Sequence, residues 1–493
     1  MKDCSSTLKT VVVTLGRSLE RIVLLGSTIL LSRYLTQNDY GTYRQVFLIS
    51  GLLITALNFG IPNSINYFLP FYSKDKQKSF LLQTILFQLF LGVLASSALW
   101  FGSGQIANIF DNPELIRSLR LFSLYPLFIL PSMSYSNIFI CINKVKLAGV
   151  LSPILGLIQL TLVVVSVLLK YSLSSLLLLL LLAAFLQFIL IMILLYKSYY
   201  KVHFSLSFSE FLNQLQFSTP IGLATIIGVA IVKIDQIMVS SFFSVEEYAV
   251  YSVGALELPF INMITISAMA VITPYLVTQK KSMRMDLFMQ KWRNSIIKLS
   301  YIIFPVAIFF LFFAHETIVV LYSNKYEDSS IIFQIYLLKL LVKVTFFGHI
   351  LLALGKSKKI LQYTLITLVV NVALNLLFIK IFGFIGAATA TVFSAFLISF
   401  LQLKEISKII NIKIKEIWPW NKMFLILSLS ILAALCANIV KILLVNKILV
   451  LAGGLLLFVS AYFLFSQIIF KKSMPANLHL VTILSGIKSN EKE

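Results

Sequence analysis

Charged side chains lie inside stretches of this sequence that are otherwise apolar. An ionised side chain at the centre of a membrane costs about 2.5–3.5 kcal/mol on insertion scales, so each one is a candidate functional residue. The cations among them are Arg17, Arg21, Lys233, Lys339 and Lys343, and the acids are Glu20, Asp235 and Glu257.

Two interpretations of these charges are open. In the first, the cations and acids pair with each other and hold the helices together. In the second, the cations line a cavity that attracts an anionic headgroup, and the three acids bind a coupling proton or sodium ion. Arginine binds phosphate through two parallel hydrogen bonds, whereas lysine acts as a point charge. Because five cations and three acids cannot all pair, we favour the cavity and take the five cations as candidate substrate-binding residues.

Polar and helix-breaking residues interrupt two of the apolar stretches. Asn58, Pro62 and Asn66 are four residues apart, so on one helix they would share a face. A second stretch contains Pro259 and Pro274. Broken helices at matching places in two halves mark the working site of a transporter, although a packing kink is the alternative. Asn58 and Asn66 are therefore further candidate substrate-binding residues.

The elements that must hold these residues are membrane-spanning helices. The 493 residues are 59% hydrophobic and 12% charged, against roughly 45–50% and about 25% in soluble domains. The apolar runs reach the roughly 20 residues that a helix needs to cross a bilayer, and they lack the short alternating segments of a barrel. We therefore predict an all-α polytopic membrane protein with about 14 transmembrane helices. Their expected ranges are 9–32, 43–69, 79–101, 117–142, 147–169, 174–196, 215–242, 250–278, 294–314, 332–354, 360–379, 384–403, 423–440 and 448–470.

The net charge of +22 reflects topology. Most lysines and arginines fall in loops on one side of the predicted membrane, and this asymmetry places both termini in the cytoplasm. A nucleic-acid partner is therefore not expected, whereas anionic membrane lipid is. The isolated Cys4, Cys141 and Cys436 indicate no disulfide framework. We identify no catalytic residues, no metal ligands and no cofactor motif, so we do not predict an enzyme.

The chain is an internal repeat. The segment from Thr36 to Tyr43 matches the segment from Ser244 to Tyr251 at an offset of 208 residues. Six helices in each copy make the repeat parallel, with the substrate route between the halves. The expected organisation is an N-terminal six-helix bundle (1–196), a cytoplasmic linker (197–214), a C-terminal six-helix bundle (215–403), an interfacial amphipathic segment (404–422), two further helices (423–470) and a cytoplasmic tail (471–493).

The repeated motif has the spacing of a helix start. Thr36 and Asp39 have capping-box spacing, and so do Ser244 and Glu247. We favour this structural role over direct contact of the motif's tyrosines with substrate.

The motifs resemble a known family. The string from Leu31 to Tyr43, followed by Asn58-Phe-Gly-Ile-Pro62, resembles the start of polysaccharide exporters of the O-antigen and capsule flippase type. These exporters belong to the multidrug/oligosaccharidyl-lipid/polysaccharide exporter superfamily. The segments from Lys233 to Gln236 and from Phe382 to Thr391 are similar to motifs of the family's second half. The resemblance covers essentially the whole chain.

The resemblance implies a fold and a function. The fold would be a V-shaped pair of six-helix bundles, like that of the multidrug exporters, with two C-terminal helices lining a groove for a lipid tail. The substrate would be an oligosaccharide repeat unit on undecaprenyl pyrophosphate, flipped by alternating access across the cytoplasmic (inner) membrane, with a polysaccharide polymerase and a chain-length regulator as partners. The cations on 9–32, 215–242 and 332–354 would meet the pyrophosphate or an acidic sugar.

Two alternatives stay open. One is a drug or cation antiporter of the same superfamily, and the other is a membrane polymerase or glycosyltransferase acting on lipid-linked sugars. The longest predicted outer segments, 102–116 and 315–331, are short for such an enzyme.

Overall fold

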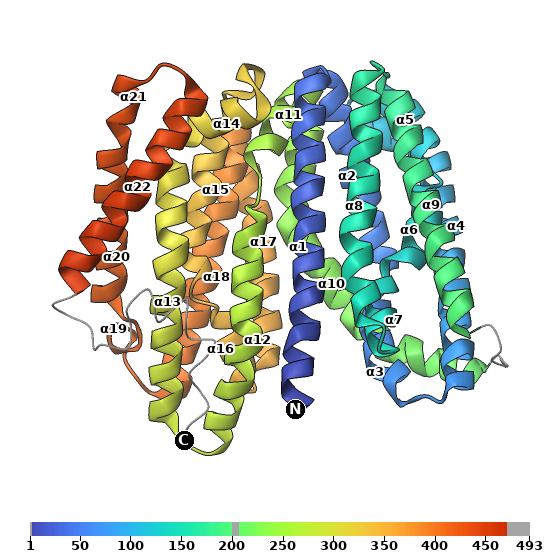
Figure 1. The fold of residues 1–493 in the computed structure, drawn as a ribbon, viewed down its shortest axis with the longest axis horizontal. Helices are drawn as coiled ribbons and strands as arrows, with labels where there is room; N and C mark the ends of the chain where they lie inside the picture. Colours follow the sequence, from blue (N-terminus) through green and yellow to red (C-terminus); the bar gives the residue numbers. More distant parts are fainter. Residues whose placement is uncertain (1, 200–206, 471–493) are drawn as a thin grey trace. The chain divides into compact units, whose positions relative to one another are not determined.

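The computed structural model describes residues 2–199 and 207–470, and the described chain consists of helices and their connections (Figure 1). Residues 200–206 of the predicted linker and the predicted tail lie outside the described residues. The chain groups into two compact units. Of the described residues, unit 1 comprises 2–199, 207–267, Leu321–Tyr336 and Lys358–Ile398, and unit 2 comprises Ala268–Val320, Leu337–Ser357 and 399–470. The predicted boundaries of the two bundles stay a prediction.

The elements are distributed over both units. Unit 1 holds α1 (Lys2–Tyr34), α2 (Gln37–Leu57), α3 (Ile61–Phe68), η1 (Leu69–Phe71), α4 (Lys74–Ile109), α5 (Glu114–Phe122), α6 (Tyr125–Met133), α7 (Tyr135–Cys141), α8 (Val145–Leu168), α9 (Leu173–Tyr199), α10 (Phe208–Phe242), α11 (Val245–Gly254) and η2 (Asn324–Tyr326). Unit 2 holds α13 (Met285–Phe312), α16 (Phe347–Ala353), α19 (Ile414–Ile417), α20 (Trp420–Asn438), α21 (Val440–Leu443) and α22 (Lys447–Phe470). Both units share α12 (Pro259–Lys281), α14 (Ala314–Tyr322), α15 (Ser329–Lys343), α17 (Ser357–Phe382) and α18 (Phe384–Ile410).

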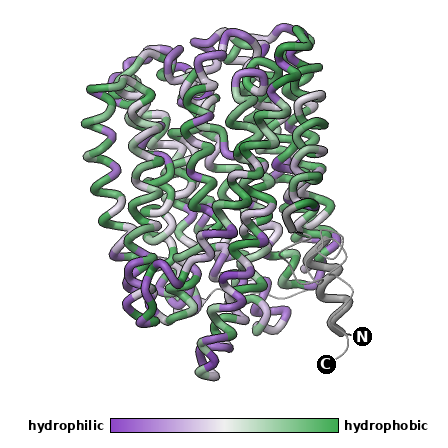
Figure 2. The backbone as a smooth tube through the Cα atoms, turned by 90° about the vertical axis from the view of Figure 1, so that its left-hand side faces the viewer, coloured by the Kyte–Doolittle hydropathy of each residue, from purple (hydrophilic) through white to green (hydrophobic). Residues whose placement is uncertain are grey.

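The predicted fold class is confirmed. Each of the expected ranges overlaps a helix, and among the described residues twelve helices are long and apolar enough to cross a membrane, or thirteen if α5 and α6–α7 form one bent span. α1 has 33 residues but is not among these twelve, because Arg17, Glu20 and Arg21 lie within it. Apolar residues follow the middles of the helices and hydrophilic residues gather toward their ends (Figure 2).

Two helices predicted as continuous are broken. The expected helix 117–142 is bent by 48° between α5 and α6, because Pro126 near the start of α6 has no N–H to donate to the preceding turn. The expected helix 332–354 is divided into α15 and α16. Phe346 has a left-handed φ of 39°, which departs from the helical value.

The predicted interruption near Asn58 is confirmed, but its geometry differs from the prediction. α2 ends at Leu57, and Phe59 and Gly60 take φ values of 50° and 69° before α3 begins. Asn58 and Asn66 therefore do not share a helix face. In the second copy the break is at residues 255–258, about three turns earlier relative to the tyrosine motif. The prediction that the two interruptions lie at matching places is therefore wrong.

The predicted amphipathic segment 404–422 begins inside a helix. α18 continues to Ile410, and the short helix α19 and residues 418–419 lead into α20. Only the stretch between Ile410 and Trp420 lies between long helices.

The repeated motif begins α2 and α11, and its capping role is confirmed. The Thr36 hydroxyl accepts from the Asp39 backbone N–H at 3.1 Å, and Ser244 and Glu247 form a reciprocal capping box. The two helices pack closely, since a Cβ on Gly41 would lie 2.3 Å from the Val245 carbonyl oxygen. The motif's four tyrosines, Tyr40, Tyr43, Tyr248 and Tyr251, are buried, which supports the structural role.

Glycines bring α1 and α8 into close contact. A Cβ on Gly16 would lie 2.0 Å from the carbonyl oxygen of Gly149, and a Cβ on Gly156 would lie 3.3 Å from the Cα of Glu20. Helices associate in membranes largely through such small residues, because lipid supplies no hydrophobic driving force between them. This contact fixes the position of the charged part of α1.

Gly16→Ala should lower the melting temperature of the detergent-solubilised protein. The added methyl overlaps backbone, and overpacking costs about 1–3 kcal/mol. Gly26→Ala on the same helix is the matched control, because a Cβ there meets nothing within 4 Å. Thermal unfolding of both variants checks this, and an unchanged melting temperature for Gly16→Ala would contradict the packing.

Candidate functional site

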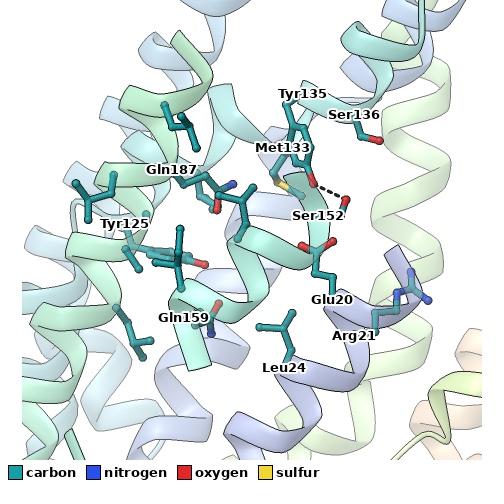
Figure 3. Close-up of a pocket in the computed structure, with 18 of the residues that line it drawn as sticks. Glu20, Arg21, Leu24, Tyr125, Met133, Tyr135, Ser136, Ser152, Gln159 and Gln187 are labelled. Atoms are coloured by element: carbon teal, nitrogen blue, oxygen red, sulfur yellow. Dashed lines mark hydrogen bonds between the residues drawn. The ribbon is translucent and has the colours of Figure 1, made fainter. Parts of the chain in front are cut away.

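A cavity of about 700 Å³ lies in unit 1, lined by α1, α6, α7, α8 and α9 with one residue of α2 (Figure 3). Arg17, Glu20 and Arg21 of α1 all line it. Its other polar lining residues are Tyr125, Tyr135, Ser136, Ser152, Gln159 and Gln187.

Hydroxyl groups orient the charges of α1. The Arg17 guanidinium donates to Ser136 Oγ at 2.9 Å. The Glu20 carboxylate lies beside Ser152 and between the two arginines in sequence, and Figure 3 shows it turned toward Tyr135 and Ser152. Tyr135 and Ser152 hydrogen-bond each other at 2.6 Å. The cluster thus carries two positive charges and one negative charge.

Sequence reasoning identified the charged residues of this cavity but missed its amides. Gln159 and Gln187 stand on the facing helices α8 and α9. Both helices are otherwise strongly apolar, so an isolated amide within each run was a usable signal. Ser136 was harder to identify, because a single serine in a membrane helix commonly bonds to its own backbone.

The lining suits an anionic, hydroxyl-rich ligand. Guanidinium groups donate to phosphate or carboxylate oxygens, and amides both donate to and accept from hydroxyls. The volume lies in the range of roughly 300–1,000 Å³ that is typical of ligand sites.

A second polar cluster in unit 1 surrounds Asp235, whose side chain is fully buried on α10. Asp235 Oδ2 accepts from the hydroxyls of Tyr251 at 3.0 Å and Thr391 at 3.2 Å, and also from Tyr336. These partners come from α11, α18 and α15. An ionisable side chain buried at membrane depth is a candidate for binding a proton or a small cation. Lys233, two residues earlier, donates to Gln236 Oε1 at 3.1 Å.

The remaining predicted site residues do not line the unit 1 cavity. Asn58 is the C-cap of α2, and Asn66 accepts from Asn137 at 3.1 Å. Glu257 is exposed and accepts from Asn262 at 2.9 Å. The structure therefore brings together Arg17, Glu20 and Arg21 in one cavity and holds Asp235 in a separate cluster. Two further predicted site residues, Lys339 and Lys343, belong to unit 2.

Comparisons with known proteins give one family match for the sequence and several solved structures with a similar fold. The model of the family described as "Polysaccharide biosynthesis protein" matches residues 30–331. No curated protein matches the sequence. Among solved structures, the lipid II flippase MurJ in an inward closed conformation has a TM-score of 0.73 at 16% identity, covering 94% of this chain and 99% of that one. An inward-facing multidrug resistance transporter of the MATE family has a TM-score of 0.63 at 14% identity, covering 80% and 96%. A Pyrococcus furiosus transporter of the same MOP superfamily has a TM-score of 0.56 at 14% identity, covering 80% and 94%. These likenesses define the fold.

Asp235→Ala should destabilise the protein, because buried hydroxyls of Tyr251, Tyr336 and Thr391 lose their acceptor. Leaving buried polar groups unsatisfied costs about 1–3 kcal/mol. The measurement is the melting temperature in detergent, with the exposed Glu257→Ala as the control for loss of a carboxylate. Equal melting temperatures for the two variants would contradict a stabilising role of the hydrogen bonds to Asp235.

Proposed function

The chain belongs to the polysaccharide biosynthesis protein family, and from this membership we propose that it flips a lipid-linked, negatively charged saccharide across the membrane. The observation that carries the proposal is the unit 1 cavity, whose lining combines Arg17 and Arg21 with amide and hydroxyl side chains. The family match and the fold shared with a lipid II flippase support it.

The substrate of the proposal is an oligosaccharide repeat unit on undecaprenyl pyrophosphate, moved from the inner to the outer leaflet of the cytoplasmic membrane. Arg17 and Arg21 bind its pyrophosphate or an acidic sugar, because guanidinium groups form paired hydrogen bonds with such anions. Gln159 and Gln187 bind sugar hydroxyls. Lys233, Lys339 and Lys343 are further candidate contacts for the anion. The cycle is alternating access, and the product serves O-antigen, capsule or exopolysaccharide synthesis.

Asp235 is the coupling residue of the proposal. The complete burial of this ionisable side chain supports a group that exchanges a proton or sodium ion during the cycle, and the three hydroxyls hold its carboxylate in place. Glu20 lines the substrate cavity itself, so it couples only if substrate and ion share that space. Glu257 is exposed, which makes it the weakest of the three candidates.

The charge of the cavity also favours this proposal over the alternatives. An antiporter for cationic drugs needs an excess of acids, whereas this lining has two arginines and one glutamate. A polymerase or glycosyltransferase needs an acid–base or nucleophile pair at its reacting centre. Glu20 is the one carboxylate of the unit 1 cavity lining, and it lies between Arg17 and Arg21 in sequence. The lining therefore offers no pair of carboxylates for acid–base catalysis.

Arg17→Ala and Arg21→Ala should each slow flipping by about tenfold or more, since each removes a charge-assisted bond to the anion. The assay uses proteoliposomes that contain a fluorescent polyprenyl-pyrophosphate saccharide, with outer-leaflet label destroyed by a membrane-impermeant reductant. Arg117→Ala, which removes an exposed arginine of α5 outside the cavity, should flip at the normal rate.

Full activity of both α1 variants would remove the cavity assignment. Efflux of a cationic dye by the same vesicles, without flipping of the lipid, would instead establish the antiporter.

Asp235→Asn should leave flipping independent of an imposed proton or sodium gradient. The amide keeps a hydrogen-bond acceptor for the surrounding hydroxyls but does not ionise. Initial rates with and without each gradient measure this, and Glu257→Gln should retain the response of the unmodified protein. A gradient response preserved in Asp235→Asn would exclude this carboxylate from coupling.

A further inference from the structure

A second cavity, of about 390 Å³, lies in unit 2 against α13. One wall is formed by Arg293, Asn294 and Ile297 of α13. The other wall is formed by the segment from Lys415 to Lys422, which joins α19 to α20.

The charge of this cavity is positive. Arg293, Lys415 and Lys422 line it together with a single acid, Glu416. Arg293 Nε donates to the Ile417 carbonyl at 3.1 Å, and its guanidinium also donates to the Glu416 carbonyl. Arg293 thereby anchors the connecting segment on α13, while the exposed side chains of Lys415 and Lys422 remain at the cavity.

Two tryptophans form the aromatic part of the lining. The rings of Trp418 and Trp420 stack with centroids 5.5 Å apart, and Trp418 also packs on Phe347 at 5.0 Å. The Trp420 side chain is half exposed. Tryptophans are enriched at the level of lipid headgroups, where one side of the ring is apolar and the other is wet.

An apolar stripe on α20 begins at this cavity. Phe424, one turn beyond Trp420, is 73% exposed, and Leu432 and Leu435 are each about half exposed. They follow the spacing of one helix face. A ligand with its anionic group in the cavity thus has a hydrocarbon-compatible surface next to it.

We propose that this unit 2 cavity binds the phosphate of an anionic membrane phospholipid. Lys415 and Lys422 attract the phosphate, Asn294 and Asn421 hydrogen-bond its oxygens, and the stacked tryptophans pack beside the headgroup. The acyl chains lie along the stripe of α20. The apolar stripe favours a phospholipid over free phosphate, because free phosphate has no hydrocarbon chain that could pack on it. The inference is independent of the proposed flipping activity.

Trp fluorescence tests the site directly, because two of the four tryptophans of the chain lie in it. The full-length protein with Trp100→Phe, which removes an exposed tryptophan elsewhere, is reconstituted in phosphatidylcholine vesicles. A small fraction of the lipid is brominated phosphatidylglycerol or, in parallel, brominated phosphatidylcholine. We expect brominated phosphatidylglycerol to quench severalfold more strongly at equal mole fraction.

Lys415→Gln with Lys422→Gln should remove most of this preference, so that the two brominated lipids quench nearly equally, since each basic residue near an anionic surface contributes strongly to lipid binding. Lys413→Gln, which removes an exposed lysine of the same segment outside the cavity, should keep it. Each single variant is measured as well, so that the test stands if the double variant fails to fold.

Three results would overturn the proposal. Equal quenching by the two brominated lipids would exclude a preference for anionic headgroups. Equal loss in Lys413→Gln would show a diffuse charge effect. Reversal of the phosphatidylglycerol quenching by millimolar inorganic phosphate would assign the cavity to free phosphate. Flipping assays on the same variants are a separate readout, so a failure here leaves the proposed function untouched.

Discussion

The structure depends on the need to satisfy polar groups in a medium that offers no water. A charge or hydroxyl within the membrane must find its partner in the protein or face an aqueous cavity. Arg17 does so through Ser136 at the cavity of unit 1. Asp235 does so through three hydroxyls from three other helices. The polar residues of the helices therefore determine where helices meet and where a cavity stays open.

Close packing is what makes the first of these sites possible. The backbone contact between Gly16 and Gly149 brings α1 onto α8, and Gly156 then faces the Cα of Glu20. A larger residue at any of these glycines would displace the charged turn of α1 from Ser152. The α1–α8 pair thus combines close packing at its glycines with a charged cluster one turn further along α1.

Composition and periodicity were enough to predict the helices, the repeat and the charged candidates, because apolar length and residue spacing are local properties. The caps at Thr36 and Ser244 were predictable for the same reason. The breaks between α5 and α6 and between α15 and α16 could not be predicted. A proline such as Pro126 is tolerated or disruptive according to its position in the helix, and nothing in the sequence signals the left-handed φ of Phe346. The partners of Asp235 could not be predicted either. They are set by tertiary packing, which pairs residues such as Asp235 and Thr391 across 156 positions.

Coupling between substrate and ion requires that both favour the same conformation, and unit 1 contains a physical connection between the two clusters. Ser240 lies on α10 little more than one turn after Asp235, and it accepts a hydrogen bond from Gln45 of α2 at 3.0 Å, with both side chains buried. Phe47, two residues further along α2, lines the cavity that holds Arg17 and Arg21. A change in the charge of Asp235 that shifts α10 must therefore carry α2 with it or break a buried hydrogen bond. The first outcome alters the cavity and the second costs free energy. Under the proposed function, the α2–α10 contact is therefore the connection between the ion site and the substrate cavity.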